Sequence, residues 1–298
     1  MQMIHYSNCP VCQSGKLQPV FSVKDYTVSE ENFTLIKCEV CTLVFTQDIP
    51  GQENIAAYYA SQNYISHSNT QKGFINQLYH RVRILTLTAK RKMIVSQTGI
   101  PQGKILDVGC GTGAFLNEMK TAGWDITGLE PDESARKKAS ELFGIHPLSS
   151  NEIFNLPANN FNVITMWHVL EHVHQLHGYV EQLKNLLTEN GCLFIAVPNY
   201  TSYDAAHYQA HWAAYDVPRH LYHFSPASIK NLMHQHELEV ILTRPMWFDS
   251  FYVSLLSEQY KNGKGNSIKA FLNGLVSNMK ALFDKEKCSS VIYIVRKI

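Results

Sequence analysis

The sequence predicts an α/β fold in which a mostly parallel sheet carries helices on both faces, preceded by a small cysteine-containing module. Three observations carry this prediction. From about residue 100 onward, short apolar runs alternate with segments of helical periodicity. A glycine-rich turn joins the first apolar run to a helix within Lys104–Leu116. Two Cys-x-x-Cys pairs lie in the first 41 residues, and the 298 residues suffice for one full core plus an appendage.

The N-terminal cysteines predict a structural zinc site. Four thiolates can hold Zn²⁺ tetrahedrally and leave no open position for catalysis, and here they are Cys9, Cys12, Cys38 and Cys41. The segments Phe21–Val28 and Phe33–Lys37 between the pairs suggest the strands of a zinc ribbon, which the metal would stabilise. Gln13 and Thr42 follow the pairs where a glycine is common. A small β-module without metal is the alternative.

Composition limits the partners and the compartment. The formal net charge of +1 gives no indication of nucleic acid or of an anionic membrane. Met1–His5 has no signal-peptide character, and no apolar run is long enough for membrane insertion. We therefore expect a cytoplasmic protein, where seven cysteines indicate metal binding or packed thiols rather than disulfides.

Residues 48–99 are predicted to link the module to the core through helices. A short helix begins at Ile55–Tyr59, and a longer one has an apolar face that contains Phe74, Ile75, Leu78, Val82, Leu85 and Met93. Its other face is basic, from Arg81 through Arg83 to Lys92, which suggests a solvated face or, alternatively, a nucleic-acid surface. Four side chains of this region could close a cleft in the core: Tyr58, Tyr59, Tyr64 and His67.

The glycine-rich turn predicts a cofactor site at the carboxyl end of a buried strand. Gly109, Gly111 and Gly113 allow a sharp turn and close approach of a ligand. Their G-x-G-x-G spacing differs from the dinucleotide pattern, and Asp107 precedes a turn without Lys or Arg, which favours a cationic cofactor over a phosphate. Glu130 follows the next strand at the spacing of an acid that binds ribose hydroxyls.

With these motifs the sequence resembles class I S-adenosylmethionine (SAM)-dependent methyltransferases. The matching segments, which with the C-terminal strands cover roughly two-thirds of the chain, are Ile105–Phe115, Ile126–Pro131, Phe161–Val173 and Gly191–Asn199. The resemblance implies a Rossmann-like sheet. It also implies a cofactor-binding set made of Asp107, Gly109, Cys110, Gly111, Gly113, Glu130, Pro131, Asn151, Glu152, Trp167 and His168.

Within that set, the resemblance gives each group a part of the cofactor. Asn151 and Glu152 are the candidates for contact with the adenine, and the strand from Phe161 delivers Trp167 and His168 beside the methionine moiety. The family usually has Phe-Asp-Val at the start of this strand, where the chain has Asn162 as the middle residue. Asn162 lies at the start of the strand, whereas the cofactor is expected at its carboxyl end.

The segment from Asp216 to Pro226 follows a core strand and is expected to emerge at the same sheet edge, where a long polar loop is usually functional. Related methyltransferases carry a similar Pro-Arg-His segment at the substrate entrance. Arg219 suits an anionic substrate group, or it could pair with Asp216 to hold the loop. A general base, where the acceptor needs one, is expected in the order His220, His223 and His168.

A helical insertion at about residues 249–287 is predicted to cap the pocket. Its second helix has an apolar face with Ile268, Phe271, Leu272, Leu275, Met279 and Leu282. A membrane-surface role would need a basic opposite face, and Lys269 and Lys280 make only a thin one.

The chain is thus divided into a zinc-ribbon module (1–47), a helical linker and possible cleft lid (48–99) and a SAM-binding domain (100–298). We expect methyl transfer to the oxygen, carbon or nitrogen of a small molecule. The resemblance extends to the ubiquinone O-methyltransferase group and to zinc-binding sugar methyltransferases, which suggests a quinone-like or sugar intermediate. An RNA methyltransferase and a SAM-holding binding module without turnover are the alternatives.

Overall fold

A computed structural model describes the backbone of residues 2–59 and 74–298, and the side chains of residues 2–59 and 85–298. The expected roles of Tyr64 and His67 lie outside the described residues. The same holds for the predicted faces of the long helix at the side chains of Phe74, Ile75, Leu78, Arg81, Val82 and Arg83.

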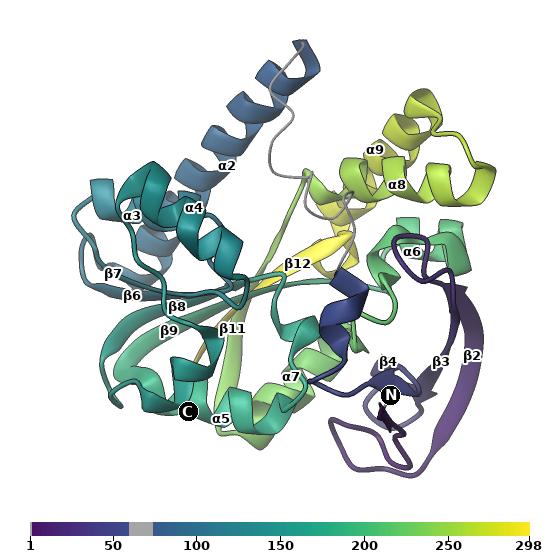
Figure 1. Ribbon diagram of the computed structural model, residues 1–298, viewed down its shortest axis with the longest axis horizontal. Coiled ribbons are helices and arrows are strands. Elements are labelled where there is room, and N and C mark those ends of the chain that lie inside the picture. Colours follow the sequence, from purple (N-terminus) through teal and green to yellow (C-terminus); the bar gives the residue numbers. More distant parts are fainter. Residues whose placement is uncertain (1, 60–73) are drawn as a thin grey trace.

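The core is a six-stranded mixed sheet in the order β11-β12-β9-β8-β6-β7 (Figure 1). The strands are β6 (Lys104–Val108), β7 (Asp125–Leu129), β8 (Phe161–Trp167), β9 (Leu187–Pro198), β11 (Leu238–Pro245) and β12 (Ser290–Lys297). Strands β7, β6, β8 and β9 are parallel, whereas β12 runs antiparallel to both β9 and β11. This arrangement confirms the predicted Rossmann-like fold class.

Helices cover both faces of this sheet. They are α2 (Phe74–Thr98), α3 (Ala114–Thr121), α4 (Glu133–Phe143), α5 (Leu176–Leu186) and α7 (Pro226–Gln235). On one face Ile94 of α2 and Phe115 of α3 share a core with Ile105 of β6. On the other, α5 and α7 pack on a core that includes Leu106. Consecutive residues of a strand point to opposite faces of the sheet. Ile105 therefore packs in the core under α2 and α3, and Leu106 in the core under α5 and α7.

After α4, Leu148 makes one parallel bridge to Leu129 at the edge of the sheet. It is followed by η2 (Ser150–Asn155), a 3₁₀ helix. The other 3₁₀ helices are η1 (Ile55–Tyr59), η3 (Leu170–His172), η4 (Gln209–His211), η5 (Ala213–Tyr215) and η6 (Lys285–Lys287).

The N-terminal module shares both a sheet and a core with the rest of the chain. Its strands are β2 (Leu17–Lys24), β3 (Asn32–Cys38) and β4 (Val44–Thr46), and they are joined by the distant β10 (Tyr222–His223) in the order β10-β4-β3-β2. A short pair, β1 (Met3–Ile4) and β5 (Ile49–Pro50), lies beside it. Val11 and Leu43 belong to the same hydrophobic cluster as α5 and α7, so the module packs as part of one continuous core.

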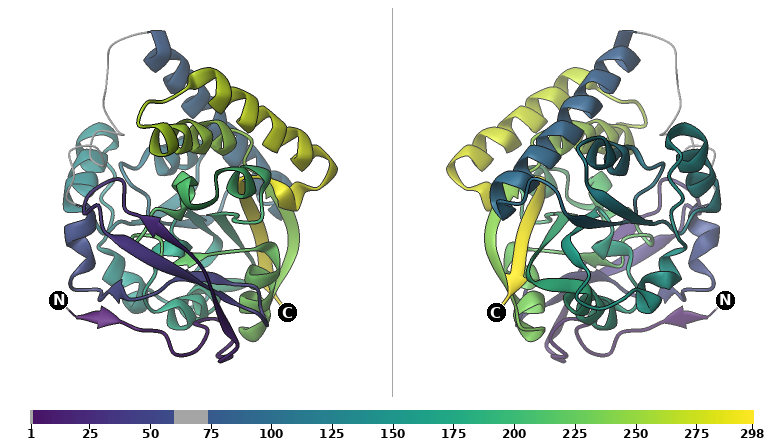
Figure 2. Two further views of the ribbon diagram at one scale, coloured as in Figure 1. Left: turned by 90° about the vertical axis from the view of Figure 1, so that its right-hand side faces the viewer. Right: turned by 90° about the vertical axis from the view of Figure 1, so that its left-hand side faces the viewer.

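An insertion between β11 and β12 forms two helices, α8 (Asp249–Asn262) and α9 (Ser267–Phe283), which contact α6 (Tyr203–Tyr208). Figures 1 and 2 place α8 and α9 at the margin of the molecule. Gly274 allows close approach, since a Cβ there would lie 2.7 Å from Cδ1 of Phe251. In the part of the chain that the structure describes, no helix has both the length and the apolar composition needed to cross a bilayer.

Candidate active site

The glycine-rich turn lies at the carboxyl ends of β6 and β7. All three glycines are left-handed, with φ of 71° at Gly109, 54° at Gly111 and 77° at Gly113. A Cβ at Gly109 would lie 2.4 Å from Cγ2 of Val169, whereas one at Gly111 would meet no atom within 4 Å. Gly109 is therefore required for packing, and Gly111 leaves space on the cleft side of the turn.

Two buried carboxylates flank the turn. Thr165 donates a 2.6 Å hydrogen bond from Oγ1 to Oδ1 of Asp107, and burial raises the pKa of Asp107 to about 7. Glu130, whose pKa burial also raises, accepts the backbone N–H of Gly111 at 2.8 Å and that of Asp132 at 3.0 Å. Glu130 thus fixes the turn against the end of β7, at the position expected of the ribose-binding acid.

A cation and an aromatic ring meet at the end of β8. The Nζ atom of Lys90 lies 4.0 Å from the ring centroid of Trp167, which makes an edge-to-face contact with Phe115. Burial lowers the pKa of Lys90 to about 8, although Asp107 and Asp249 oppose the shift. The ring face of Trp167 and the two carboxylates attract the ammonium of Lys90, but they do not fully offset the cost of burying its charge.

The remaining predicted cofactor residues follow the same edge. Cys110 is buried against Leu116 and Ile145, so its side chain packs in the core and its backbone forms the turn. Pro131 is exposed directly after Glu130. Asn151 and Glu152 are exposed on η2, after the bridge that Leu148 makes beside β7.

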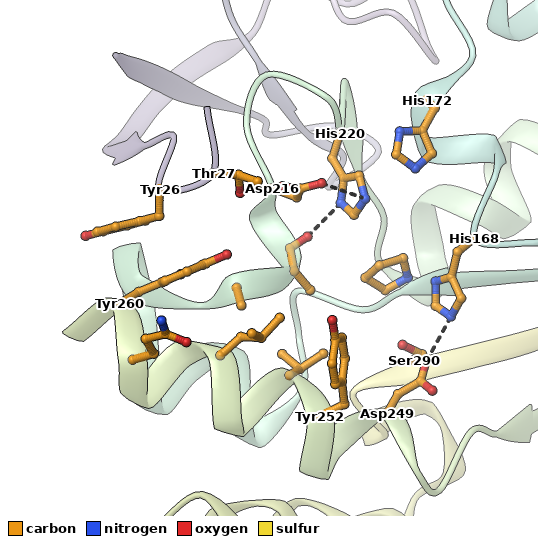
Figure 3. Close-up of a pocket in the computed structure, with 16 residues that line it drawn as sticks. Tyr26, Thr27, His168, His172, Asp216, His220, Asp249, Tyr252, Tyr260 and Ser290 are labelled. Atoms are coloured by element: carbon orange, nitrogen blue, oxygen red, sulfur yellow. Dashed lines mark hydrogen bonds and ion pairs between the residues drawn. The ribbon is translucent and has the colours of Figure 1, made fainter. Parts of the chain in front are cut away.

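A cavity of about 610 Å³ lies beside His168, the residue that follows the end of β8 (Figure 3). Distant parts of the chain line it, among them Tyr26 and Thr27 of the N-terminal module, His168 and His172 after β8, Asp216 and His220 of the loop before β10, and the α8 residues Asp249, Tyr252 and Tyr260. Tyr26 stacks on Tyr260, with ring centroids 4.4 Å apart. The module that carries the cysteines therefore contributes directly to the wall of the cavity.

His168 lines the cavity directly after the end of β8. It adopts a left-handed φ of 59°, follows Trp167 directly and places Nε2 2.9 Å from Oδ2 of Asp249. Its Nδ1 lies 3.4 Å from Oε1 of Glu171. Burial opposes protonation, but the two carboxylates outweigh it and raise the pKa of His168 to about 10. His168 is therefore a cation at neutral pH, which makes it a poor general base.

His220 and His172 present the opposite chemistry. The Nδ1 atom of His220 lies 2.8 Å from the carbonyl oxygen of Ala214, and that of His172 lies 2.9 Å from the carbonyl oxygen of Arg219. A carbonyl can only accept, so Nδ1 of His220 carries a proton, and in the neutral ring its Nε2 keeps a lone pair. Nδ1 of His172 also lies 2.9 Å from the hydroxyl of Tyr59. Burial, together with the neighbouring His220, lowers the pKa of His172 to about 4. The two rings meet edge to face, 4.6 Å apart.

Glu171 is the acid that sequence reasoning left without a role. It is fully buried, and Oε1 makes the 3.4 Å ion pair with His168. It also lies with His172 and His220 in a group whose ligand atoms are within 4.8 Å of one another. In the sequence, the indication of this role is that Glu171 follows His168 by three residues, a spacing at which the two side chains can pair. Asp249 was also missed, because only the fold brings α8 to the end of β8.

Two of the four predicted catalytic residues do not line the cavity. Arg219 is 1% exposed and donates to Asp25, to Asp216 and to the carbonyl oxygen of Tyr58. It therefore holds the loop, which is the alternative that its sequence context left open. His223 is buried, with Nε2 3.1 Å from Oγ1 of Thr46, because β10 pairs with β4.

The four N-terminal cysteines converge with the geometry of a metal site. Their sulfur atoms all lie within 4.8 Å of one another, and the Cys9–Cys41 and Cys12–Cys38 pairs are each 3.5 Å apart. A tetrahedron with Zn–S bonds of about 2.3 Å has sulfurs about 3.8 Å apart, so the set fits zinc. Gln13 and Thr42 adopt φ of 58° and 65°, the backbone shape that glycine would supply there.

Comparison with known proteins is consistent with this geometry. A family model described as a methyltransferase domain matches residues 79–243, more than half of the chain. The chain belongs to the methyltransferase domain family. Solved methyltransferases show the same fold: a SAM-dependent methyltransferase from Archaeoglobus fulgidus has a TM-score of 0.50 at 16% identity, with 76% of this chain and 100% of that chain covered. Magnesium protoporphyrin IX methyltransferase from Synechocystis PCC 6803 has a TM-score of 0.51 at 12% identity, with 81% and 97% covered.

Curated relatives of this methyltransferase domain include ubiquinone biosynthesis O-methyltransferases. The protein from Histophilus somni is 33% identical over 114 residues, which cover 35% of this chain and 48% of the relative. The one from Actinobacillus pleuropneumoniae is 36% identical over 110 residues, 33% of this chain and 47% of the relative. The matched segment thus spans about half the length of these relatives.

Proposed function

We propose that the protein is a SAM-dependent methyltransferase that transfers a methyl group to a small molecule bound in the 610 Å³ cavity. One observation carries the proposal: His168, which lines the cavity, directly follows Trp167 at the end of β8, the strand end beside which we place the cofactor. A methyl group presented at the end of β8 would therefore face a bound acceptor directly. Membership of the methyltransferase domain family supports this function.

The residues of the cleft suit the cofactor. Glu130 would hold the ribose hydroxyls, Asn151 and Glu152 the adenine, and the backbone at Gly111 the amino-acid part. Bound SAM supplies an electrophilic methyl group on a sulfonium. The carboxylate of Asp107, at the end of β6, would attract the positive charge of the sulfonium.

His220 is proposed to accept the proton of an acceptor hydroxyl. Its protonated Nδ1 donates to Ala214, which leaves Nε2 as an acceptor at the cavity wall. His172 and Glu171 lie behind it, and the Glu171 carboxylate stabilises the imidazolium that proton transfer would form. His168, held as a cation by Asp249, would bind an electron-rich group of the acceptor and orient it.

The cavity walls favour a cyclic acceptor of modest size. Tyr26, Tyr252 and Tyr260 supply flat aromatic surface, while Thr27 and Asp216 supply polar groups. A quinone-like ring or a sugar would satisfy both kinds of contact. The net charge of +1 disfavours RNA as the substrate.

Zinc is proposed as the structural metal of the N-terminal module. Four thiolates would complete its coordination, so its role is to hold β3 and the turns around it in shape. Tyr26 and Thr27 lie in the connection between β2 and β3, and the metal would thereby support the cavity wall as well.

Calorimetric titration with S-adenosylhomocysteine, with NAD as the control ligand, tests the cofactor assignment. Binding of S-adenosylhomocysteine alone, at micromolar concentration, is the expected result. If the folded protein binds neither ligand, the proposal loses its central support, and a protein that binds NAD instead would contradict it outright. Zinc quantified on the same sample, at one ion per chain, tests the metal separately.

A further inference from the structure

The packing of α9 is the reverse of that of an ordinary amphipathic helix. Its inward face consists of small residues, Ala270, Gly274, Ser277 and Ala281, all of which are buried against neighbouring elements. The large apolar residues point outward instead. Those that are exposed are Ile268, Phe271, Leu272, Leu275, Met279, Leu282 and Phe283. The predicted apolar face therefore exists, but it faces solvent and does not cap the cavity.

This outward face is continuous and large for a protein surface. Its residues recur at helical spacing from Ile268 to Leu282, so they form one stripe along all of α9. Ile268 is 75% exposed and Phe283 is 93% exposed. Contiguous apolar surface of this kind marks an interaction site. Among the described residues nothing covers it, and Figure 2 shows the helix at the margin of the molecule.

The charges around the stripe indicate the chemistry of its partner. Between Gln259 and Phe283 the only charged side chains are Lys261, Lys264, Lys269 and Lys280, and all four are exposed. The nearest acids in sequence are engaged: Glu258 accepts hydrogen bonds from Tyr208 and Asn262, Asp284 caps η6 and Glu286 pairs with Lys230. Lys280 lies over the ring of Tyr203. An apolar stripe beside the exposed Lys261, Lys264 and Lys269 complements a surface that is apolar inside and negative outside.

We propose that α9 docks the protein on the surface of an anionic lipid bilayer. The helix would lie in the plane of the interface, with Ile268, Leu275 and Leu282 among the acyl chains and the lysines at the lipid headgroups. The helix has 17 residues and rests against the protein along its small-residue face. Docking would therefore insert only its outward side chains and leave the helix backbone at the interface. The neighbouring α8 packs against α9 and lines the cavity with Tyr252 and Val253. The docking face and the cavity wall thus belong to one helical pair.

Flotation of the full-length protein with vesicles tests the proposal. We expect it to float with vesicles of phosphatidylglycerol and phosphatidylethanolamine, to bind phosphatidylcholine vesicles far more weakly, and to lose binding as salt screens the charges. The triple variant Ile268→Ser, Leu272→Ser, Leu282→Ser should stay in the soluble fraction. Its matched control changes three equally exposed residues elsewhere, Val40→Ser, Leu85→Ser and Leu142→Ser, and should float as the parent does.

The contribution of charge has its own pair of variants. Lys264→Gln with Lys269→Gln should weaken vesicle partition about twenty-five-fold, because each lysine near an anionic surface contributes about five-fold. Lys16→Gln with Lys120→Gln, two exposed lysines on other parts of the chain, should change it less than two-fold.

Two results would overturn the proposal. One is a wild-type protein that ignores anionic vesicles. The other is a dimer in sedimentation velocity that the triple serine variant, but not its control, converts to monomers, because the stripe would then be a contact between copies. Titration of each variant with S-adenosylhomocysteine in solution shows whether the core is intact, so failure of docking and failure of the proposed catalytic function are separate observations.

Discussion

Arg219 and Asp25 form a buried ion pair across 194 positions of sequence, with Nη2 of the arginine 2.9 Å from Oδ1 of the aspartate. Asp25 also accepts the backbone N–H groups of Thr27 and Ser29, which shape the connection that carries Tyr26 to the cavity. The same guanidinium binds Asp216 at the cavity wall. One side chain therefore fixes both the N-terminal module and the active-site loop.

Replacing Arg219 should destabilise the whole protein. In Arg219→Ala the carboxylates of Asp25 and Asp216 lose their counter-ion, and leaving a buried charge uncompensated costs about 3–5 kcal/mol. Urea unfolding measures the free energy. Lys137→Ala, which removes an exposed pair with Glu141, serves as the control and should cost less than about 0.5 kcal/mol. Similar losses in both variants would refute the structural role of Arg219.

Gly111→Val should abolish binding of S-adenosylhomocysteine without unfolding the protein. The side chain would enter the cofactor side of the turn and strain a φ of 54°. Gly144→Val is the matched control, because Gly144 has a φ of 58° and equally open surroundings at the end of α4. The control should share the strain and keep the affinity. Normal binding by Gly111→Val would show that the turn is not the cofactor site.

Asp249→Asn should lower the pKa of His168. In the parent protein burial is outweighed by Asp249 and Glu171, so the ring titrates near pH 10. This pKa is raised above the ordinary histidine value of about 6.5. The charged ring therefore stabilises the folded state fully below about pH 6.5, and this stabilisation disappears as the pH rises through 10. NMR titration of the parent protein should show no protonation step of the His168 ring between pH 5 and 8. In Asp249→Asn the protonation step should move down from about pH 10. An unchanged titration would contradict the pairing.

His220→Gln should reduce methyl transfer to an acceptor hydroxyl by about 10²–10⁴-fold and leave binding of S-adenosylhomocysteine unchanged. His223→Gln changes a buried histidine of β10 that does not line the cavity. This second variant should alter stability and keep the rate of methyl transfer. An undiminished rate in His220→Gln would assign the base elsewhere.

Loss of one cysteine ligand should affect more than the N-terminal module. Cys38→Ser leaves three thiolates for the metal, and the cluster belongs to the core shared with α5 and α7. We expect zinc content below one ion per chain and a single unfolding transition at lower temperature. Cys110 is a buried cysteine outside the cluster, so the variant Cys110→Ser should bind as much zinc as the parent protein. Two separate transitions in Cys38→Ser would show that the module unfolds independently.

Local patterns were sufficient to predict the core. The strand at Ile105, the left-handed glycines and the acid at Glu130 depend on neighbours in sequence, and they lie where the pattern placed them. The cysteines converge as expected because zinc ligands follow fixed spacings.

Long-range pairing decided the remaining features. His220 and His223 belong to the same short segment, yet only the pairing of β10 with β4 determines that His220 faces the cavity and His223 the core. Arg219 and Asp249 likewise depend on partners far away in sequence. The apolar stripe of α9 was identified correctly, but its direction depends on the small residues opposite, which fit closely against α8.

The pairing of β10 with β4 also constrains the order in which the protein can mature during synthesis. The four thiolates have all left the ribosome soon after Cys41, so metal capture can begin early. The edge of β4 that later receives Tyr222 and His223 has no strand partner until the ribosome has added some 180 further residues. A nascent chain that has bound zinc therefore carries an N-terminal module whose β4 edge is unpaired for most of translation. Pairing of that edge with β10 coincides with synthesis of the active-site loop.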